Sequence, residues 1–264
     1  SAQNLRMLDG GELHFGLANA SVTLPAVSGL EPFEKQFPVR AVISLHASVN
    51  LFVALEDSDL SDFSDFTGKR VAVGPAGGGW DSFTRPILAA HGVNYSDIRP
   101  VYEGQSNAMT MLTDRIVDAV QVAGSIPHAP ILAASATHKL QYVEFDEASL
   151  DTLRAQYPTI QKYMIPGGTY EGMDADFWAV DAGTCQLIVR ADADPDFVYL
   201  IVKTIYENRA MMAELVRHGA EITPERAAMD IGIPYHEGSL RYFEEIGILN
   251  PETDGTIETL LPDL

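Results

Sequence analysis

Short runs of apolar, mainly β-branched residues alternate along the chain with longer stretches in which apolar residues recur every three or four positions. The first pattern is typical of buried strands, and the second is typical of helices that cover one face of a sheet. This alternation favours an α/β fold over an all-α or all-β fold. Strands are predicted at Leu13–Ala18, Arg40–Leu45, Asn50–Leu55, Lys69–Gly74, Tyr95–Tyr102, Val117–Ala123 and Lys139–Phe145, and within Phe177–Ala191 on either side of Gly183.

Helical patterns separate these strands and fill the C-terminal third. Gly92 is the predicted cap at the end of the first helix, because glycine readily adopts the left-handed conformation. The order of strands and helices from 68 to 177 predicts one body, and the flanking segments predict a second. Helices are predicted from the glycines after Gly74 to Ala90, and at Ser106–Arg115, Pro127–Ala136, Asp146–Tyr157, Asp196–Arg209, Ala210–His218 and Ser239–Ile246.

Composition and charge exclude several classes of protein. Hydrophobic residues make up 46% of the 264 residues and charged residues 20%, which is typical of a globular protein. No apolar run reaches the roughly 18 residues that a membrane span needs. A formal net charge of −20, with 17 Lys and Arg among 37 acidic residues, argues against a nucleic-acid surface. The same negative charge repels an approaching anionic ligand, so the binding of an anion would have to depend on local dipoles in its site.

The most specific feature is a strand, a glycine loop and a helix at Arg70–Pro86, with three successive glycines at 77–79. Glycines allow a tight turn, and the free N–H groups at a helix start favour an anion. Ser82 and Thr84 could add hydroxyl donors, and Trp80 could stack on the ligand. The loop has no lysine for a P-loop and lacks the dinucleotide spacing G-x-G-x-x-G. A plain tight turn without a ligand is the alternative.

Small polar residues also follow four of the predicted strands. The carboxyl ends of parallel strands face the ligand crevice in α/β proteins, so these side chains are candidates for its lining. Each one taken singly is also explained by turn chemistry. The residues are Asn19, Ser21 and Thr23, then His46, then Glu103–Asn107, and finally Gly124 and Ser125.

The remaining motifs point to no chemistry. The seven histidines show no H-E-x-x-H or H-x-H spacing, so no metal or other cofactor is predicted. Cys185 is the single cysteine, which excludes an intramolecular disulfide, and it lacks a catalytic signature. No G-x-S-x-G motif occurs. The acidic stretch Glu56–Thr67 lacks the glycine and final glutamate of an EF-hand and is predicted to be a solvated linker.

Five segments, in order, resemble the solute-binding subunits of TRAP transporters, specifically the TAXI subgroup. The last departs from the pattern P-L-H-P-G-A-x-x-Y-Y, because Glu237 and Ser239 replace proline and alanine. The resemblance extends from Ser1 to about Leu249. The segments are 4–16 (NLRMLDGGELHFG), 66–79 (FTGKRVAVGPAGGG), 115–119 (RIVDA) with 124–127 (GSIP), 165–170 (IPGGTY) and 233–243 (IPYHEGSLRYF) with 245–247 (EIG).

This resemblance implies a fold like that of type II periplasmic binding proteins, with two lobes, a ligand cleft and hinge strands. Residues 1–67 and 178–264 would form lobe I, and residues 68–177 would form lobe II. The implied ligand is a small carboxylate or an amino acid such as glutamate, with no cofactor and no catalysis. The implied partners are the membrane permease subunits of a TRAP transporter, and the implied location is periplasmic.

The resemblance also implies ligand contacts around the glycine loop. Gly77, Gly78 and Gly79, with Trp80, correspond to a G-S-G segment that contacts the ligand carboxylate. Gly79 lies near a place where the family often offers a hydroxyl, so Ser82 is expected to supply that donor.

Further contacts are implied elsewhere in the chain. Asn19 and Ser21 correspond to a polar pair after the family's second strand, and His46 stands where the family usually has an aromatic residue. Gly124 corresponds to a glycine of the second lobe at the cleft. Tyr170 belongs to a matching motif and is the last expected contact.

Family members normally begin with a strand, a glycine-rich loop and a helix before the segment matched at Ser1. The given sequence opens after that part, and Ser1–Asp9 has no signal-peptide pattern. A ligand-sensing or ABC-type receptor of the same fold is the alternative function. An enzyme on this fold is a third possibility, but it needs an acid–base pair in the cleft, and the sequence offers no candidate.

Overall fold

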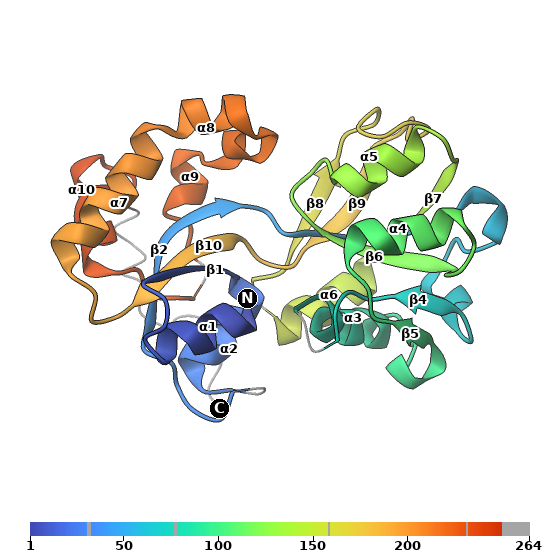
Figure 1. The fold of residues 1–264 in the computed structure, drawn as a ribbon, viewed down its shortest axis with the longest axis horizontal. Coiled ribbons are helices and arrows are strands. Elements are labelled where there is room, and N and C mark those ends of the chain that lie inside the picture. Colours follow the sequence, from blue (N-terminus) through green and yellow to red (C-terminus); the bar gives the residue numbers. More distant parts are fainter. Residues whose placement is uncertain (31–32, 77–78, 158, 231, 250–264) are drawn as a thin grey trace. The chain divides into compact units, whose positions relative to one another are not determined.

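The computed structural model describes residues 1–30, 33–76, 79–157, 159–230 and 232–249. The chain forms two compact units, which are described separately (Figure 1). Unit 1 comprises Ser1–Ala47 and Gly183–Leu264, and unit 2 comprises Ser48–Ala182. Both units contain strands and helices, so the predicted α/β class is confirmed. Within the described ranges, no helix is both long and apolar enough to cross a bilayer.

Unit 1 is built on a three-stranded antiparallel sheet in the order β1-β10-β2. The strand from the second half of the chain therefore lies between the two from the first half. The strands are β1 (Phe15–Asn19), β2 (Val39–His46) and β10 (Cys185–Arg190), and the helices are α1 (Ala2–Asp9), α2 (Ala20–Ser28), α7 (Pro195–Glu207), α8 (Arg209–Leu215), α9 (Pro224–Ala227) and α10 (Glu237–Glu245), with a 3-10 turn at Arg217–Glu221.

Helices α7 and α10 pack closely in unit 1. Val198, Val202 and Tyr206 are the buried residues of α7, and their spacing of four places them on one face of the helix. Proline at the first position of α7 follows Asp194, whose carboxylate accepts two backbone N–H groups. Gly238 of α10 lies against α7, because a Cβ atom placed there would be 2.3 Å from the carbonyl oxygen of Pro195.

Unit 2 is built on a seven-stranded mixed sheet in the order β5-β4-β6-β3-β9-β8, with β7 also pairing with β3. β4 is parallel to β5 and β6, whereas β3 is antiparallel to β6, β7 and β9. The elements are β3 (Val49–Leu55), β4 (Arg70–Ala72), α3 (Gly79–Ala90), β5 (Arg99–Val101), α4 (Gln105–Thr113), β6 (Ala119–Gly124), α5 (Ala129–Ser135), β7 (Leu140–Val143), α6 (Glu147–Gln156), β8 (Gln161–Ile165) and β9 (Phe177–Asp181), with 3-10 turns at Glu56–Ser58, Phe63–Phe66 and Tyr95–Asp97.

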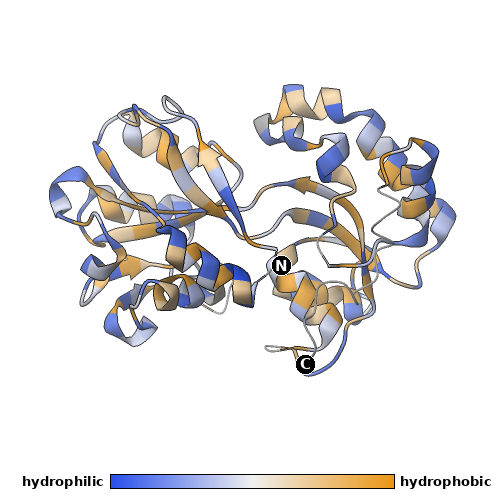
Figure 2. Ribbon diagram, turned by 180° about the vertical axis from the view of Figure 1, so that it is seen from behind, coloured by the Kyte–Doolittle hydropathy of each residue, from blue (hydrophilic) through white to orange (hydrophobic). Residues whose placement is uncertain are grey.

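Helices cover both faces of this sheet. In Figure 1, α3 and α6 lie on one face, and α4 and α5 lie on the other. Every residue of β3 is buried, as expected for a central strand covered on both sides. Figure 2 shows the same division: the strands are mainly hydrophobic in colour, while the helices carry hydrophilic stretches.

The topology of unit 2 brings several chain ends to one edge of the sheet. β4, β5 and β6 are parallel and finish at this edge, which we call the carboxyl edge. β3 begins there, because Val49 pairs with Gly124 at the end of β6. β9 ends there, because Val49 also pairs with Asp181. The chain therefore enters and leaves unit 2 at its carboxyl edge.

Two sequence-based boundaries differ from the structure. The first boundary between units follows Ala47 rather than residue 67, and the second follows Ala182 rather than residue 177. The reason is β3, which the prediction placed in lobe I but which pairs with three strands of unit 2. The strand predicted at Tyr95–Tyr102 is a 3-10 turn followed by the shorter β5, because Asn94 and Asp97 cap the turn.

The contact of α10 with α7 generates a prediction. Gly238→Ala should gain about 1 kcal/mol from helix propensity, yet we expect a net loss of about 2 kcal/mol in the free energy of unfolding, because the methyl group overlaps α7. Urea denaturation measures the change. Gly104→Ala is the control, since a Cβ atom there meets nothing within 4 Å. A Gly238→Ala protein as stable as the parent would contradict the close packing.

Candidate functional site

The carboxyl edge of unit 2 collects most of the polar positions that the sequence singled out. Gly74 lies just beyond the end of β4, Tyr102 follows β5, and Gly124 ends β6. In α/β proteins such an edge carries ligand sites, since the loops there are free to vary while the strands hold them in place.

The loop after β4 is shaped by Gly74 and Trp80. Gly74 has φ +84°, and a Cβ atom on it would lie 2.7 Å from Cε3 of Trp80. Only glycine satisfies both the backbone angle and the close approach of the indole. Gly77 and Gly78 lie outside the described residues, so their predicted role as amide donors stays a prediction.

The first turn of α3 carries a buried acid. Gly79 opens the helix, and Ser82 lies in it with a side chain outside the described set. The carboxylate of Asp81 accepts a hydrogen bond from the hydroxyl of Tyr95 and pairs with Arg85 at 3.5 Å. A carboxylate here interacts favourably with the positive end of the helix dipole and therefore partly neutralises it.

Arg85 and Tyr95 form a small structural cluster around that carboxylate. The guanidinium of Arg85 stacks 3.7 Å from the ring centroid of Tyr95. Burial, and then the hydrogen bond to Asp81, raise the pKa of Tyr95 well above its usual value. The phenol therefore stays protonated and remains a donor to the acid.

The end of β6 is held by α4 and by a buried histidine. The side-chain amide of Gln105, at the start of α4, donates to the carbonyl oxygen of Ala123. Gly124 has φ +141°, and a Cβ atom there would lie 3.9 Å from Nε2 of His128. Position 124 thus requires glycine because of its positive φ angle, and not because a side chain would meet a close neighbour.

Tyr170 holds the buried side chain of His128 in place. The hydroxyl oxygen of Tyr170 accepts the backbone N–H of His128 at 2.9 Å and lies 3.2 Å from its Nδ1. The hydroxyl of Tyr170 therefore contacts both the backbone and the ring of His128. Burial lowers the pKa of His128 to about 4, partly offset by the carbonyl of Val49.

Tyr170 was expected to contact the ligand, but in the structure its side chain is buried in the core of unit 2. Its side chain is only 2% exposed, and it stacks on Tyr142 with ring centroids 5.9 Å apart. Burial raises its pKa to about 12. Its described contacts are thus with His128 and the core rather than with solvent.

The carboxyl edge is acidic. Asp81 and Glu103 lie in the segments that form it, and Asp181 ends β9. Those segments, 73–76, 79–84, 102–107 and 124–128, contain no lysine or arginine. An anion at this edge would therefore depend mainly on N–H and O–H dipoles, because Arg85, one residue beyond these segments, already pairs with Asp81.

In unit 1 the other expected residues gather at one end of the sheet. Asn19, Cys185 and His46 occupy one row across the three strands, since Cys185 pairs with both of its neighbours. Asn19 also precedes α2, whose first turn contains Ser21. The structure thus brings three of the predicted residues of unit 1 together.

A polar cluster that the sequence did not indicate lies beside His46. The ring of His218 is 4.7 Å from that of His46, and Glu221 accepts the backbone N–H of Ala47. Arg226 donates to Thr184 at 3.0 Å. Burial lowers the pKa of His46, with His218 adding to the effect and the carbonyl of Ala47 opposing it. These residues are distant in sequence, so no local motif could reveal them.

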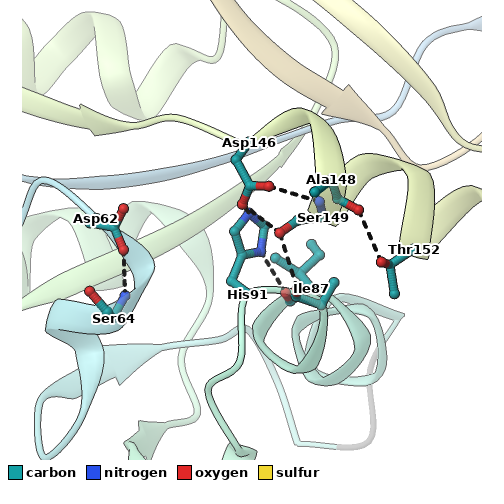
Figure 3. A network of polar contacts seen from close by, with 9 residues as sticks. Asp62, Ser64, Ile87, His91, Asp146, Ala148, Ser149 and Thr152 are labelled. Carbon is teal, nitrogen blue, oxygen red and sulfur yellow. Dashed lines mark hydrogen bonds and ion pairs between the residues drawn. The ribbon is translucent and has the colours of Figure 1, made fainter.

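His91 and Asp146 form a second histidine network, in unit 2 (Figure 3). Nδ1 of His91 donates to the carbonyl oxygen of Ile87, and Nε2 lies 3.4 Å from a carboxylate oxygen of Asp146. Asp146 also caps α6 through the backbone N–H of Ser149. Burial lowers the pKa of His91 although Asp146 opposes this. The pair joins the end of α3 to the start of α6, which is a structural role.

Comparison with known families identifies the chain. The model of the NMT1-like family matches residues 1–247. The chain belongs to the NMT1-like family. The resemblance to the TAXI subgroup covered the same stretch and is therefore wrong. Its motifs misled because short glycine turns after strands recur in α/β proteins whatever their family.

Solved structures similar to this NMT1-like protein include the alkanesulfonate-binding protein SsuA from Xanthomonas axonopodis pv. citri bound to MOPS. That match has 19% identity, covers 98% of this chain and 68% of the other, and has a TM-score of 0.47. The periplasmic aliphatic sulphonate binding protein SsuA from Escherichia coli matches at 16% identity, with 95% and 70% covered and a TM-score of 0.47. A substrate binding domain of a putative amino acid ABC transporter from Streptococcus pneumoniae matches at 14%, with 86% and 79% covered and a TM-score of 0.43.

The described ranges contain no candidate metal site. There, no three His, Cys, Asp or Glu side chains gather in a way that could hold a metal ion. The histidines with described partners are instead committed to backbone carbonyls, hydroxyls and neighbouring rings.

The buried, neutral His128 generates a prediction about pH. Its pKa of about 4 in the folded protein lies below the value of about 6.5 in an unfolded chain, so the unfolded state takes up the proton first as pH falls. The stabilisation is complete above pH 6.5 and is lost towards pH 4. Between pH 7 and 4 the parent should lose about 3 kcal/mol more unfolding free energy than His128→Gln.

Urea denaturation at a series of pH values measures this difference. His138→Gln removes an exposed histidine of the same unit and is the control. Parallel pH profiles for the parent and His128→Gln would show that His128 is not buried in its neutral form.

Proposed function

We propose that this NMT1-like protein is an extracytoplasmic solute-binding protein of the ABC-transporter type that binds a small amino acid or carboxylate and does not transform it. The observation that carries the proposal is the carboxyl edge of unit 2, where the ends of β4, β5 and β6 and the starts of α3 and α4 come together. Such an arrangement presents backbone N–H groups to a ligand.

Binding rather than catalysis is supported by how the groups at this edge are used. The hydroxyl of Thr84 is shared with Gln121 and the backbone, and the ring of His128 is fixed by Tyr170. Asp81 is held by Tyr95 and Arg85. A general acid or base must instead be able to reach the substrate and exchange a proton with it.

The charge of the edge suggests the kind of ligand. The N–H groups suit a carboxylate, while the acidic side chains Asp81, Glu103 and Asp181 disfavour a multiply charged anion and favour an ammonium group nearby. A zwitterion such as an amino acid meets both conditions. The residues of unit 2 proposed to contact it are Gly77, Gly78, Gly79, Trp80, Ser82 and Gly124. The expected contacts of unit 1, Asn19, Ser21 and His46, stay predictions.

The transporter class follows from the alternatives left by the sequence. With the TAXI assignment excluded, the ABC-type receptor is the function that we propose. Its partners would be the permease subunits of an ABC transporter, and its location would be outside the cytoplasmic membrane.

A thermal-shift panel tests the ligand class. We expect L-glutamate or taurine, each with an amine, to raise the Tm more than glutarate or inorganic sulfate. A ligand at 100 times its Kd stabilises the native state by about 3 kcal/mol, which raises the Tm by about 5–10 °C. No shift with any of the four compounds would contradict the proposed ligand class.

Two tryptophan variants test the place of binding. Trp80→Ala should weaken binding of the active compound about tenfold, because stacking on the indole is lost. Trp178→Ala is the matched control, since Trp178 lies on β9, partly exposed, with Lys162 above its ring. Equal affinities in the two variants would place the ligand elsewhere.

A further inference from the structure

A chain of buried hydrogen bonds crosses the sheet of unit 2 just inside the carboxyl edge. The hydroxyl of Thr84 in α3 donates to Oε1 of Gln121 in β6. The Nε2 amide of Gln121 donates to Oδ1 of Asn50 in β3 at 3.0 Å, and the Nδ2 amide of Asn50 donates to the carbonyl oxygen of Ser48 at 3.1 Å. All four residues are buried.

The direction of this series of hydrogen bonds is fixed at the Ser48 end. The carbonyl of Ser48 can only accept, so the nitrogen of Asn50 must face it, and the orientation of Gln121 then follows. The oxygen of Gln121 is left facing Thr84. The hydroxyl of Thr84 also lies 2.9 Å from the carbonyl oxygen of Trp80, one turn earlier in α3.

At its Ser48 end, this series of hydrogen bonds meets the two segments that connect unit 2 to the rest of the protein. The carbonyl of Ser48 accepts a second hydrogen bond, from the backbone N–H of Ala182 at 2.9 Å. The backbone N–H of Ser48 donates to the carboxylate of Asp181 at 2.9 Å. The entering and leaving strands are thus joined to each other and to the turn that holds Trp80.

This polar chain is not needed to fill the core. It lies among apolar residues, and burying amide and hydroxyl groups has a desolvation cost that the hydrogen bonds only offset. Replacing all the partners of such a network with apolar groups of similar shape is often neutral for stability. A role in stability alone therefore does not explain it.

We propose that Thr84, Gln121 and Asn50 are positioning residues, which fix the first turn of α3 and the Trp80 indole relative to the connecting strands. They act on the ligand only through that turn. The part of this inference that concerns affinity rests on the proposed function, whereas the part that concerns the position of Trp80 does not.

The test uses Trp80 as its own reporter. The protein has two tryptophans, so Trp178→Phe leaves Trp80 as the single emitter. In this background we compare the parent with the triple variant Thr84→Val, Gln121→Leu, Asn50→Leu. We expect a Tm close to that of the parent, emission at longer wavelength, and stronger acrylamide quenching. The Kd for L-glutamate should rise about tenfold.

Single variants keep the test decisive if the triple variant does not fold. Thr84→Val should give a smaller red shift of the Trp80 emission and a smaller increase in acrylamide quenching than the triple variant. Thr84→Ser keeps the hydroxyl and should match the parent in both. Ser149→Ala is the control for destabilisation alone: its hydroxyl contacts the carbonyl of Ala90 at the other end of α3, and its emission should match that of the parent.

Each outcome decides the proposal. Unchanged emission and quenching of Trp80 in both the triple variant and Thr84→Val would overturn it. The changes described, with a retained Tm, support it over a purely structural role. If L-glutamate does not bind the parent, the proposed ligand fails, but the emission of Trp80 still decides whether these residues position it.

Discussion

Unit 2 depends on β3, a strand whose seven residues are all buried and which pairs with β6 on one side and with β9 and β7 on the other. Burial on both faces leaves room for only one polar side chain, Asn50, and that side chain is part of a hydrogen-bonded chain. The pairing of Val49 with Gly124 and Asp181 also brings the entering strand, the leaving strand and the end of β6 to the same edge.

The chemistry of the carboxyl edge follows from this constraint. A buried acid in the first turn of α3, paired with Arg85, and a neutral histidine beneath Gly124 give an edge that is rich in dipoles and whose loops carry no lysine or arginine. With a net charge of −20, the protein then has no long-range attraction for anions. Selectivity must come from short-range geometry.

Much of the fold could be predicted from the sequence, because its strands are dense in β-branched residues and its longer helices are strongly periodic. The Gly92 cap is confirmed by bonds from Gly92 to Ala89 and from Val93 to Leu88. The helix α2 was missed, since Pro25 lies inside it and its apolar residues are not confined to one face. The clusters around His46 and His128 could not be predicted, because Arg226 and Tyr170 approach them from distant parts of the chain. The family was mistaken for the same reason, as local motifs say little about tertiary contacts.

The order β1-β10-β2 has a consequence for how the chain folds during synthesis. Residues 48–182 form one continuous stretch, so unit 2 has all of its partners as soon as that stretch is complete. β1 and β2 are made before unit 2 but do not pair with each other, and each pairs only with β10, which starts at Cys185 and is made after unit 2. Until then β1 and β2 carry unpaired strand edges, which are exposed to aggregation. β1 and β2 are therefore made before unit 2 but reach their native pairing after it.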